Sequence, residues 1–300
     1  MKHPLRRADT WQGYLFIMPW LLGFAVLTAG PMLFSLFASF TDYDMTSRMN
    51  FVGISNYLTM FTKDDLFWVS LYNTFFFVIW SVPLTTIGAM ILALLLNKGI
   101  PGQRLFRTIF YLPAVLSGVG VYLLWMQMLS PSSGLINTML GFIGIDGPAW
   151  LADPEWTKPA LILMKMWSVG GSMLFYLASL QSVPKTLYEV GALEGANWWH
   201  RFRYITFPLI TPVVFFDLIT STIGAFQIFS EAYVMSEGGN GGPVNSLLFY
   251  NLRIWNQAFE VYNMGYAMSM TWFLFVIVLL LTLFNFKFAK KWVYYEGDRR

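Results

Sequence analysis

Six stretches of this 300-residue chain are apolar for long enough to cross a membrane as helices, since a span needs about 20 mostly apolar residues. Prolines interrupt several of them, which a membrane helix tolerates because neighbouring groups can satisfy the freed backbone atoms. The sequence therefore predicts an all-α membrane protein with six transmembrane helices. The stretches are Gly13–Phe40, Val69–Leu96, Leu105–Met128, Pro159–Leu180, Pro208–Tyr233 and Tyr266–Phe288.

Composition excludes a pair of water-soluble domains, although 300 residues would ordinarily allow them. Charged residues make up 12% of the chain, against about 25% in an average soluble protein. The basic residues form no patch with interleaved aromatic residues, so we expect no nucleic-acid partner. The chain has no cysteine, which excludes disulfides, thiolate catalysis and cysteine-ligated metals. The first apolar run is longer than the ~7–15 residues of a signal peptide and has no A-x-A site, so we expect it to be retained as a span.

The distribution of Lys and Arg predicts the orientation, because cytoplasmic connectors carry the excess of these residues. Both termini are then cytoplasmic, as are residues 97–104 and 181–207. We expect a cytoplasmic N-terminus (1–12) followed by a single transmembrane domain (13–300). No connector is long enough to fold alone, so any energy source must lie on another chain. The side predicted to be cytoplasmic holds fourteen of the nineteen Lys and Arg residues, namely Lys2, Arg6, Arg7, Lys98, Arg104, Arg107, Lys185, Arg201, Arg203, Lys287, Lys290, Lys291, Arg299 and Arg300.

The connector 181–207 is unusually long and charged for a link between two apolar segments. Thr186 and Glu189 have the spacing of a capping box, which predicts a short helix from Leu187 to Leu193. Gly195 suits the left-handed position that ends a helix, and Asn197 suits the cap of a second one. The pattern predicts two short helices joined by small residues, and we call the connector 181–207 the elbow. The plainer alternative is that Glu189 only caps its helix and the nearby tryptophans only lie among lipid headgroups.

The elbow resembles the EAA loop of permease subunits in binding-protein-dependent ABC importers, E-A-A-x-x-D-G-A followed by I-x-L-P. Here it reads EVGALEGA at 189–196 and ITFP at 205–208. Of the departures from this pattern, we expect Gly191 to loosen the first short helix. Other segments, among them "FRTIFYLPAVLSGVGVYLLW" and "GGPVNSLLFYNLRIWNQAF", resemble the sugar-importer branch, which is similar to the maltose and glycerol-phosphate permeases.

This resemblance implies a type I ABC importer permease fold in the bacterial plasma (inner) membrane. It implies that the elbow is seated on a cytoplasmic ATPase subunit, with Glu189 paired to a basic group there. The implied partners are a second homologous permease, two copies of the ATPase subunit and an extracytoplasmic solute-binding protein that delivers a mono- or oligosaccharide. ATP and magnesium would be bound by the ATPase subunits, and this chain would bind no cofactor. The coupling residues would be Glu189, Ala192, Glu194, Gly195, Ala196, Arg201 and Pro208.

Ionisable residues within spans are candidates for a functional site. Lys165 lies in the fourth stretch, and Asp217 and Glu231 lie in the fifth, so either carboxylate could be the counter-ion of Lys165. Gly170 and Gly171 predict a helix break or a close-packing site. The fifth stretch has helical spacing that predicts one polar stripe, which lines a solute path or packs against the helices of a partner permease. The stripe comprises Asp217, Thr220, Ser221, Gly224, Gln227 and Glu231.

Three other classes compete with an importer subunit. The sequence has no H-E-x-x-H and no phosphate-binding G-x-x-x-x-G-K-[ST], and its histidines are His3 and His200, so we expect no catalytic residues and no metal site. A secondary active transporter for a small polar solute would call for inverted repeats and leaves the elbow without a purpose. A bare scaffold does not need the polar stripe. Among solutes, a free sugar is favoured over a phosphorylated one, because no cluster of Lys and Arg faces the path.

Overall fold

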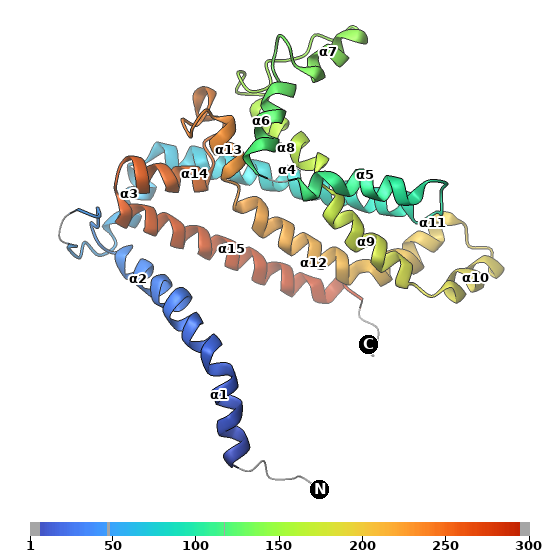
Figure 1. The fold of residues 1–300 in the computed structure, drawn as a ribbon, viewed down its shortest axis with the longest axis horizontal. Coiled ribbons are helices and arrows are strands. Elements are labelled where there is room, and N and C mark those ends of the chain that lie inside the picture. Colours follow the sequence, from blue (N-terminus) through green and yellow to red (C-terminus); the bar gives the residue numbers. More distant parts are fainter. Residues whose placement is uncertain (1–6, 47–48, 117, 295–300) are drawn as a thin grey trace. The chain divides into compact units, whose positions relative to one another are not determined.

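The computed structural model describes residues 7–46, 49–116 and 118–294, and most of them are helical (Figure 1). The only β pairing within these ranges is an isolated bridge between Thr41 and Phe51. The all-α prediction is confirmed. The helices are α1 (Arg7–Phe24), α2 (Gly30–Ala38), α3 (Ser55–Thr62), α4 (Asp65–Leu96), α5 (Gln103–Val115), α6 (Val119–Met128), α7 (Leu135–Phe142), α8 (Thr157–Trp167), α9 (Gly170–Ser182), α10 (Lys185–Leu193), α11 (Trp198–Arg201), α12 (Phe207–Phe226), α13 (Ser230–Met235), α14 (Tyr250–Trp255) and α15 (Met264–Trp292).

Short π-helical turns continue several of these helices, at Ala25–Ala29, Phe202–Thr206 and Asn256–Glu260. Four helical runs within the described residues are long and apolar enough to cross a membrane, namely Gly13–Ala38, Asp65–Leu96, Trp198–Phe226 and Met264–Trp292. Two bent pairs, α5 with α6 and α8 with α9, bring the number to six if each pair is one span. The six predicted stretches therefore correspond to helical segments. The N-terminal segment 1–12 lies partly outside the described residues, and the orientation in the membrane stays a prediction.

The chain divides into two compact units. The first holds α1, α2, α3 and the beginning of α15, to Phe275. Within it, the hydroxyl of Tyr266 donates to Asp64 at 2.7 Å, and the indole N–H of Trp272 donates to the Ser35 hydroxyl at 3.2 Å. Only 6% of the apolar window in Gly13–Ala38 is buried. This span therefore leaves almost its whole circumference free for lipid or another chain.

The second unit is built around α4, which packs against α8, α9 and α12 (Figure 1). Helix α4 has 32 residues and extends over about 48 Å, more than the ~30 Å of a hydrocarbon core. Ala89 and Ala93 on α4 are fully buried against Met173 and Tyr176 of α9 and Ile210 of α12. Small residues spaced four apart let helix backbones approach closely, which is the usual way that helices associate in lipid.

Three predicted spans are broken. The third bends by 106° between α5 and α6, and the fourth bends by 44° between α8 and α9. The fourth break directly precedes Gly170, where a Cβ would collide with the backbone carbonyl of Phe110 on α5. Gly171 has no such neighbour. Gly170 thus serves both purposes that the sequence left open, a break and a close approach.

The fifth predicted span, Pro208–Tyr233, is wrong at its outer end. Helix α12 stops at Phe226, and α13 begins afresh at Ser230. Between them Phe229 has φ −147° and ψ −62°, which no α-helix contains. A single stripe from Asp217 to Glu231 therefore does not exist, because the residues belong to two helices.

Candidate functional site

The first short helix of the elbow is α10, which begins at Lys185. Pro184 precedes it in an extended conformation, and no side chain caps the helix. The predicted capping box at Thr186 and Glu189 is therefore wrong. Proline fixes its own φ and favours the position just before or at a helix start, so the helix begins two residues before the predicted one and Thr186 lies inside it.

The far end of α10 forms as predicted. Gly195 has φ +77° and its N–H donates to the Ala192 carbonyl at 3.1 Å, while the N–H of Ala196 donates to the Gly191 carbonyl at 2.8 Å. This pair of bonds closes a helix end around a left-handed residue. Asn197 then caps α11 by accepting the backbone N–H of His200 at 2.9 Å. Because α11 continues through the π turn into α12, the elbow is directly joined to a membrane span.

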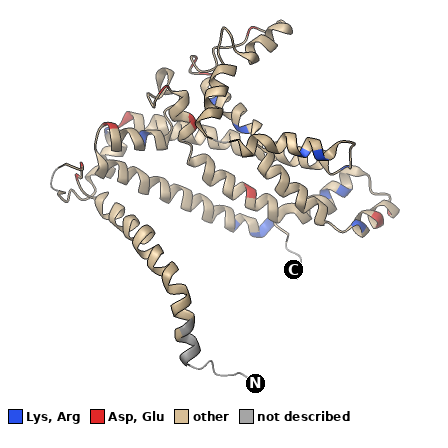
Figure 2. Ribbon diagram, in the orientation of Figure 1, with Lys and Arg blue, Asp and Glu red and all other residues tan. Residues whose placement is uncertain are grey.

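The elbow has two different faces. Four of the predicted coupling residues, Glu189, Ala192, Glu194 and Gly195, are exposed on the outer face, and Leu193 beside them is 89% exposed. The other three, Ala196, Arg201 and Pro208, are partly buried. Lys and Arg residues gather on α5, α10 and α11 at the same end of the second unit (Figure 2). Because Glu189 and Glu194 are exposed on the outer face, a partner can reach both carboxylates.

Gly191 lies on the inner face and is buried. A Cβ at this position would lie 3.2 Å from the Cδ1 atom of Ile205 and 3.6 Å from the Cγ atom of Arg201. The glycine thus lets α10 pack closely on the π turn that leads into α12. This packing opposes the loosening of α10 that the sequence predicts for Gly191.

Asp217 on α12 is 5% exposed and accepts four hydrogen bonds from hydroxyl groups. Ser172 and Tyr176 of α9 each donate at 2.6 Å, Thr86 of α4 donates at 3.2 Å, and Ser221 donates at 3.4 Å from the next turn of α12. The carboxylate therefore ties α12 to α4 and α9. Of the two roles open for Asp217, the contacts are those of a helix-to-helix link, here within this chain.

The other residues of the predicted stripe do not converge. The Thr220 hydroxyl donates to the Phe216 carbonyl of its own helix at 2.9 Å, and its side chain is exposed. Gly224 and Gln227 are exposed at the end of α12. Glu231, by contrast, lies on α13 and is half-buried.

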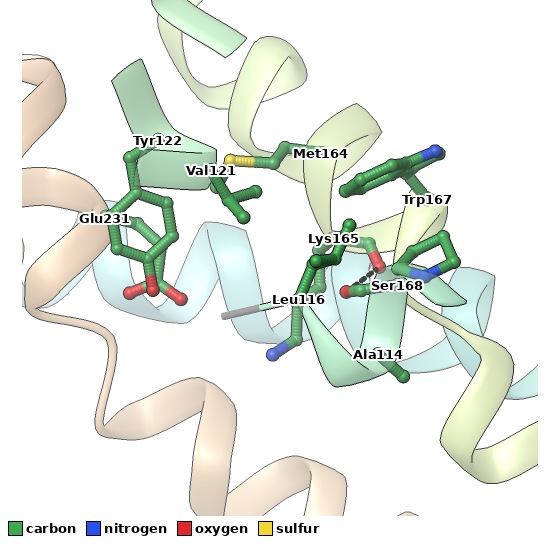
Figure 3. Close-up of a pocket in the computed structure, with 10 residues that line it drawn as sticks. Ala114, Leu116, Val121, Tyr122, Met164, Lys165, Trp167, Ser168 and Glu231 are labelled. Atoms are coloured by element: carbon green, nitrogen blue, oxygen red, sulfur yellow. Dashed lines mark hydrogen bonds between the residues drawn. The ribbon is translucent and has the colours of Figure 1, made fainter. Parts of the chain in front are cut away.

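Glu231 and Lys165 line one cavity of about 280 Å³, between the α5–α6 break and α8 (Figure 3). The phenol of Tyr122 on α6 lies against the Glu231 carboxylate. Trp167, at the end of α8, contributes an aromatic face and is held edge-on by Trp125 at 5.8 Å between ring centres. No ion pair joins Lys165 to Glu231 or to Asp217, so neither predicted counter-ion is engaged.

Sequence reasoning missed Tyr122 and Trp167. The available signal was the run "KMWSVGG", where a polar residue and two glycines follow a lysine and a tryptophan and interrupt an apolar span. For metals, the described residues contain no group of three or more His, Cys, Asp and Glu side chains that could hold an ion.

A bundle of apolar helices with an exposed charged elbow and a polar cavity at two helix breaks defines a membrane transport subunit. Residues 67–293 match the family model described as the binding-protein-dependent transport system inner membrane component, and the chain belongs to this family. It is thus a multi-pass inner-membrane protein and a permease subunit of an ABC transporter, which removes the secondary transporter from consideration.

Relatives and solved structures agree with this assignment. The chain is 41% identical over 293 residues to the probable ABC transporter permease protein YesP of Bacillus subtilis (strain 168), covering 97% of this chain and 94% of that one. It is 37% identical to the lactose transport system permease protein LacF of Rhizobium radiobacter, covering 96% and 97%. A bacterial alginate ABC transporter, solved in complex with an alginate pentasaccharide-bound periplasmic protein, has a chain with TM-score 0.81 and 25% identity, covering 94% of each.

Proposed function

We propose that this chain imports a carbohydrate, a mono- or oligosaccharide, through the cavity at Tyr122, Lys165, Trp167 and Glu231. The composition of this cavity is the observation that carries the proposal, because aromatic faces with a few fixed polar groups suit a solute that is polar at its hydroxyls and apolar at its ring faces. Names of similar proteins support the class, since LacF transports lactose and the solved relative handles alginate.

The cavity favours a neutral sugar over a phosphorylated one. Lys165 is its only cationic lining residue among the described residues, and Glu231 supplies a negative charge in the same cavity. Phosphate is normally held by two or more charge-assisted hydrogen bonds, often from arginine. Glu231 would instead accept hydrogen bonds from sugar hydroxyls, and Lys165 would donate to them.

The energy for transport would come from two copies of a cytoplasmic ATPase subunit, which bind ATP and magnesium. A solute-binding protein would deliver the sugar on the extracytoplasmic side, and a second homologous permease would complete the membrane channel. The exposed carboxylates of the elbow would contact the ATPase, whose closure would turn the spans from inward- to outward-facing. This chain itself would hydrolyse nothing.

Sugar uptake by the complete transporter in proteoliposomes tests the cavity. Trp167→Ala and Glu231→Gln should each lower uptake by about tenfold or more, the usual cost of removing one shaped contact in a binding site. Trp80→Ala is the matched control, because Trp80 is 54% exposed on α4 and does not line the cavity. Normal uptake by both cavity variants, with the complex assembled, would rule out this path.

A further inference from the structure

A second hollow, of about 220 Å³, lies on the inner face of the elbow, and no role has yet been given to it. At roughly 30 Å³ for each water molecule, it has room for a small ionic group with some water. The ends of α4 and α9 form one side of it, and α10 with the start of the α11–α12 helix forms the other. Its lining residues are Leu94, Asn97, Lys98, Leu180, Tyr188, Trp198, Arg201, Phe202 and Thr206.

The charge of this hollow is entirely positive. Lys98 and Arg201 line it, and no Asp or Glu of the described residues does. The Nε atom of Arg201 is buried and has no hydrogen-bond partner. A buried N–H without an acceptor is unfavourable, because it has lost water without gaining a partner. The Nε–H of Arg201 therefore lacks an acceptor among the described residues.

Neutral hydrogen-bonding groups complete the lining. The hydroxyls of Tyr188 and Thr206 lie 2.9 Å apart, and the Thr206 hydroxyl also contacts the Arg201 carbonyl at 3.3 Å. These bonds join α10 to the base of α12, so the inner wall is held in place by the fold. Asn97 adds an amide at the rim, one residue beyond α4.

The hollow lies at the ends of two apolar helices and beside the first turns of a third. Leu94 is two residues from the end of α4, Leu180 is two residues from the end of α9, and Thr206 lies nine residues along the helical run Trp198–Phe226. Helices of spanning length end where hydrocarbon gives way to headgroups, and tryptophans such as Trp198 are frequent at this depth. Leu94 and Leu180 give the hollow an apolar part beside its two cations.

We propose that this hollow binds the phosphate group of an anionic lipid, with Arg201 and Lys98 as its two cations. Basic pockets between membrane helices are known to hold lipid headgroups. Trp198 and Phe202 flank the headgroup, and the acyl chains lie along α4 and α9. In this proposal Arg201 binds the lipid and does not contact the ATPase. The inference does not depend on the nature of the transported solute.

The test uses the complete transporter in nanodiscs of phosphatidylcholine with increasing phosphatidylglycerol. The unfolding temperature and the phosphatidylglycerol retained in native mass spectrometry are both measured. The wild type should be stabilised and should retain the anionic lipid. Arg201→Gln and Lys98→Gln should each weaken the apparent affinity by about fivefold, the effect of one basic residue at an anionic surface. Arg203→Gln is the matched control, because Arg203 is exposed two residues away and does not line the hollow.

Arg201→Lys keeps the charge and should retain most of the lipid effect, which keeps the test valid if Arg201→Gln does not assemble. A parallel arm adds inorganic phosphate to neutral nanodiscs. Protection that depends on Arg201 there would support the same site with phosphate from solution as its ligand. Equal losses in Arg201→Gln and Arg203→Gln would show diffuse surface charge and overturn the proposal. Loss of the ATPase subunit with an unchanged lipid dependence would overturn it too, since a protein group would then be the partner of Arg201.

Discussion

At the scale of single residues, Asp217 shows what a carboxylate within a helix bundle requires. Four hydroxyl donors from α4, α9 and α12 surround it, and its side chain is 5% exposed. Burying a charge in an apolar bundle is expensive unless donors replace the lost water. Because the donors come from three helices, the Asp217 carboxylate also holds those helices together.

Asp217→Asn is expected to lower the stability of the protein by about 1–3 kcal/mol, because the amide offers one acceptor oxygen and turns two N–H donors toward hydroxyls. Thermal unfolding of the purified chain measures the loss. Thr220→Val is the control on the same helix, since the Thr220 hydroxyl bonds only to carbonyls of α12. If the two variants unfold at the same temperature, the link through Asp217 contributes nothing to stability.

At the scale of elements, the elbow contains two glycines with opposite requirements. Gly195 sits at φ +77°, where a Cβ costs about 1 kcal/mol, whereas Gly191 is inside a helix and gains about as much from alanine. Gly195→Ala should therefore speed hydrogen exchange of the amides of residues 185–197. Gly191→Ala should leave it unchanged or slower, because the Ile205 side chain at 3.2 Å can move. Faster exchange in Gly191→Ala would mean that the close approach outweighs helix propensity.

The break between α8 and α9 makes a second prediction at this scale. Gly170→Ala should destabilise the protein by about 2 kcal/mol or more, because the new methyl collides with the α5 backbone and the helices must separate. Gly171→Ala is the adjacent control, with open space around its Cβ. Unfolding temperatures of the two variants give the comparison. A large loss at Gly171 would contradict the packing seen at this break.

At the scale of the whole molecule, much of the fold can be predicted from composition and from small residues. Apolar length alone locates the spans, and Gly195 and Asn197 mark the elbow because they act through their own backbone or through neighbours three residues away. The end of α12 could not be found this way, since "AFQIFSEAYV" has no glycine or proline at the break and its polar residues keep helical spacing across it. Three of the four partners of Asp217 could not be found either, because they come from helices 41 to 131 residues away in sequence.

The proposed coupling to an ATPase is also a property of the whole molecule. Glu189→Lys should reduce copurification of the ATPase subunit and sugar uptake together, since reversing a charge in an interface costs several kcal/mol when its partner is basic. Asp146→Lys is the control, as Asp146 is exposed on a connector far from the elbow in sequence. Affinity purification with quantified ATPase measures the association. Undiminished association and uptake in Glu189→Lys would exclude this carboxylate as the contact.

The separation of α13 from α12 has a consequence for how such a transporter diversifies. Glu231 is carried on a helix of six residues, joined to α12 by three residues, while the hydroxyl cluster that holds the bundle lies fourteen residues earlier, at Asp217. Substitutions in α13 can alter the cavity without disturbing that cluster. Under the proposed function, selectivity and foldability therefore lie in different parts of the chain, and exchanging residues 230–235 among relatives is a small graft that should change the preferred sugar.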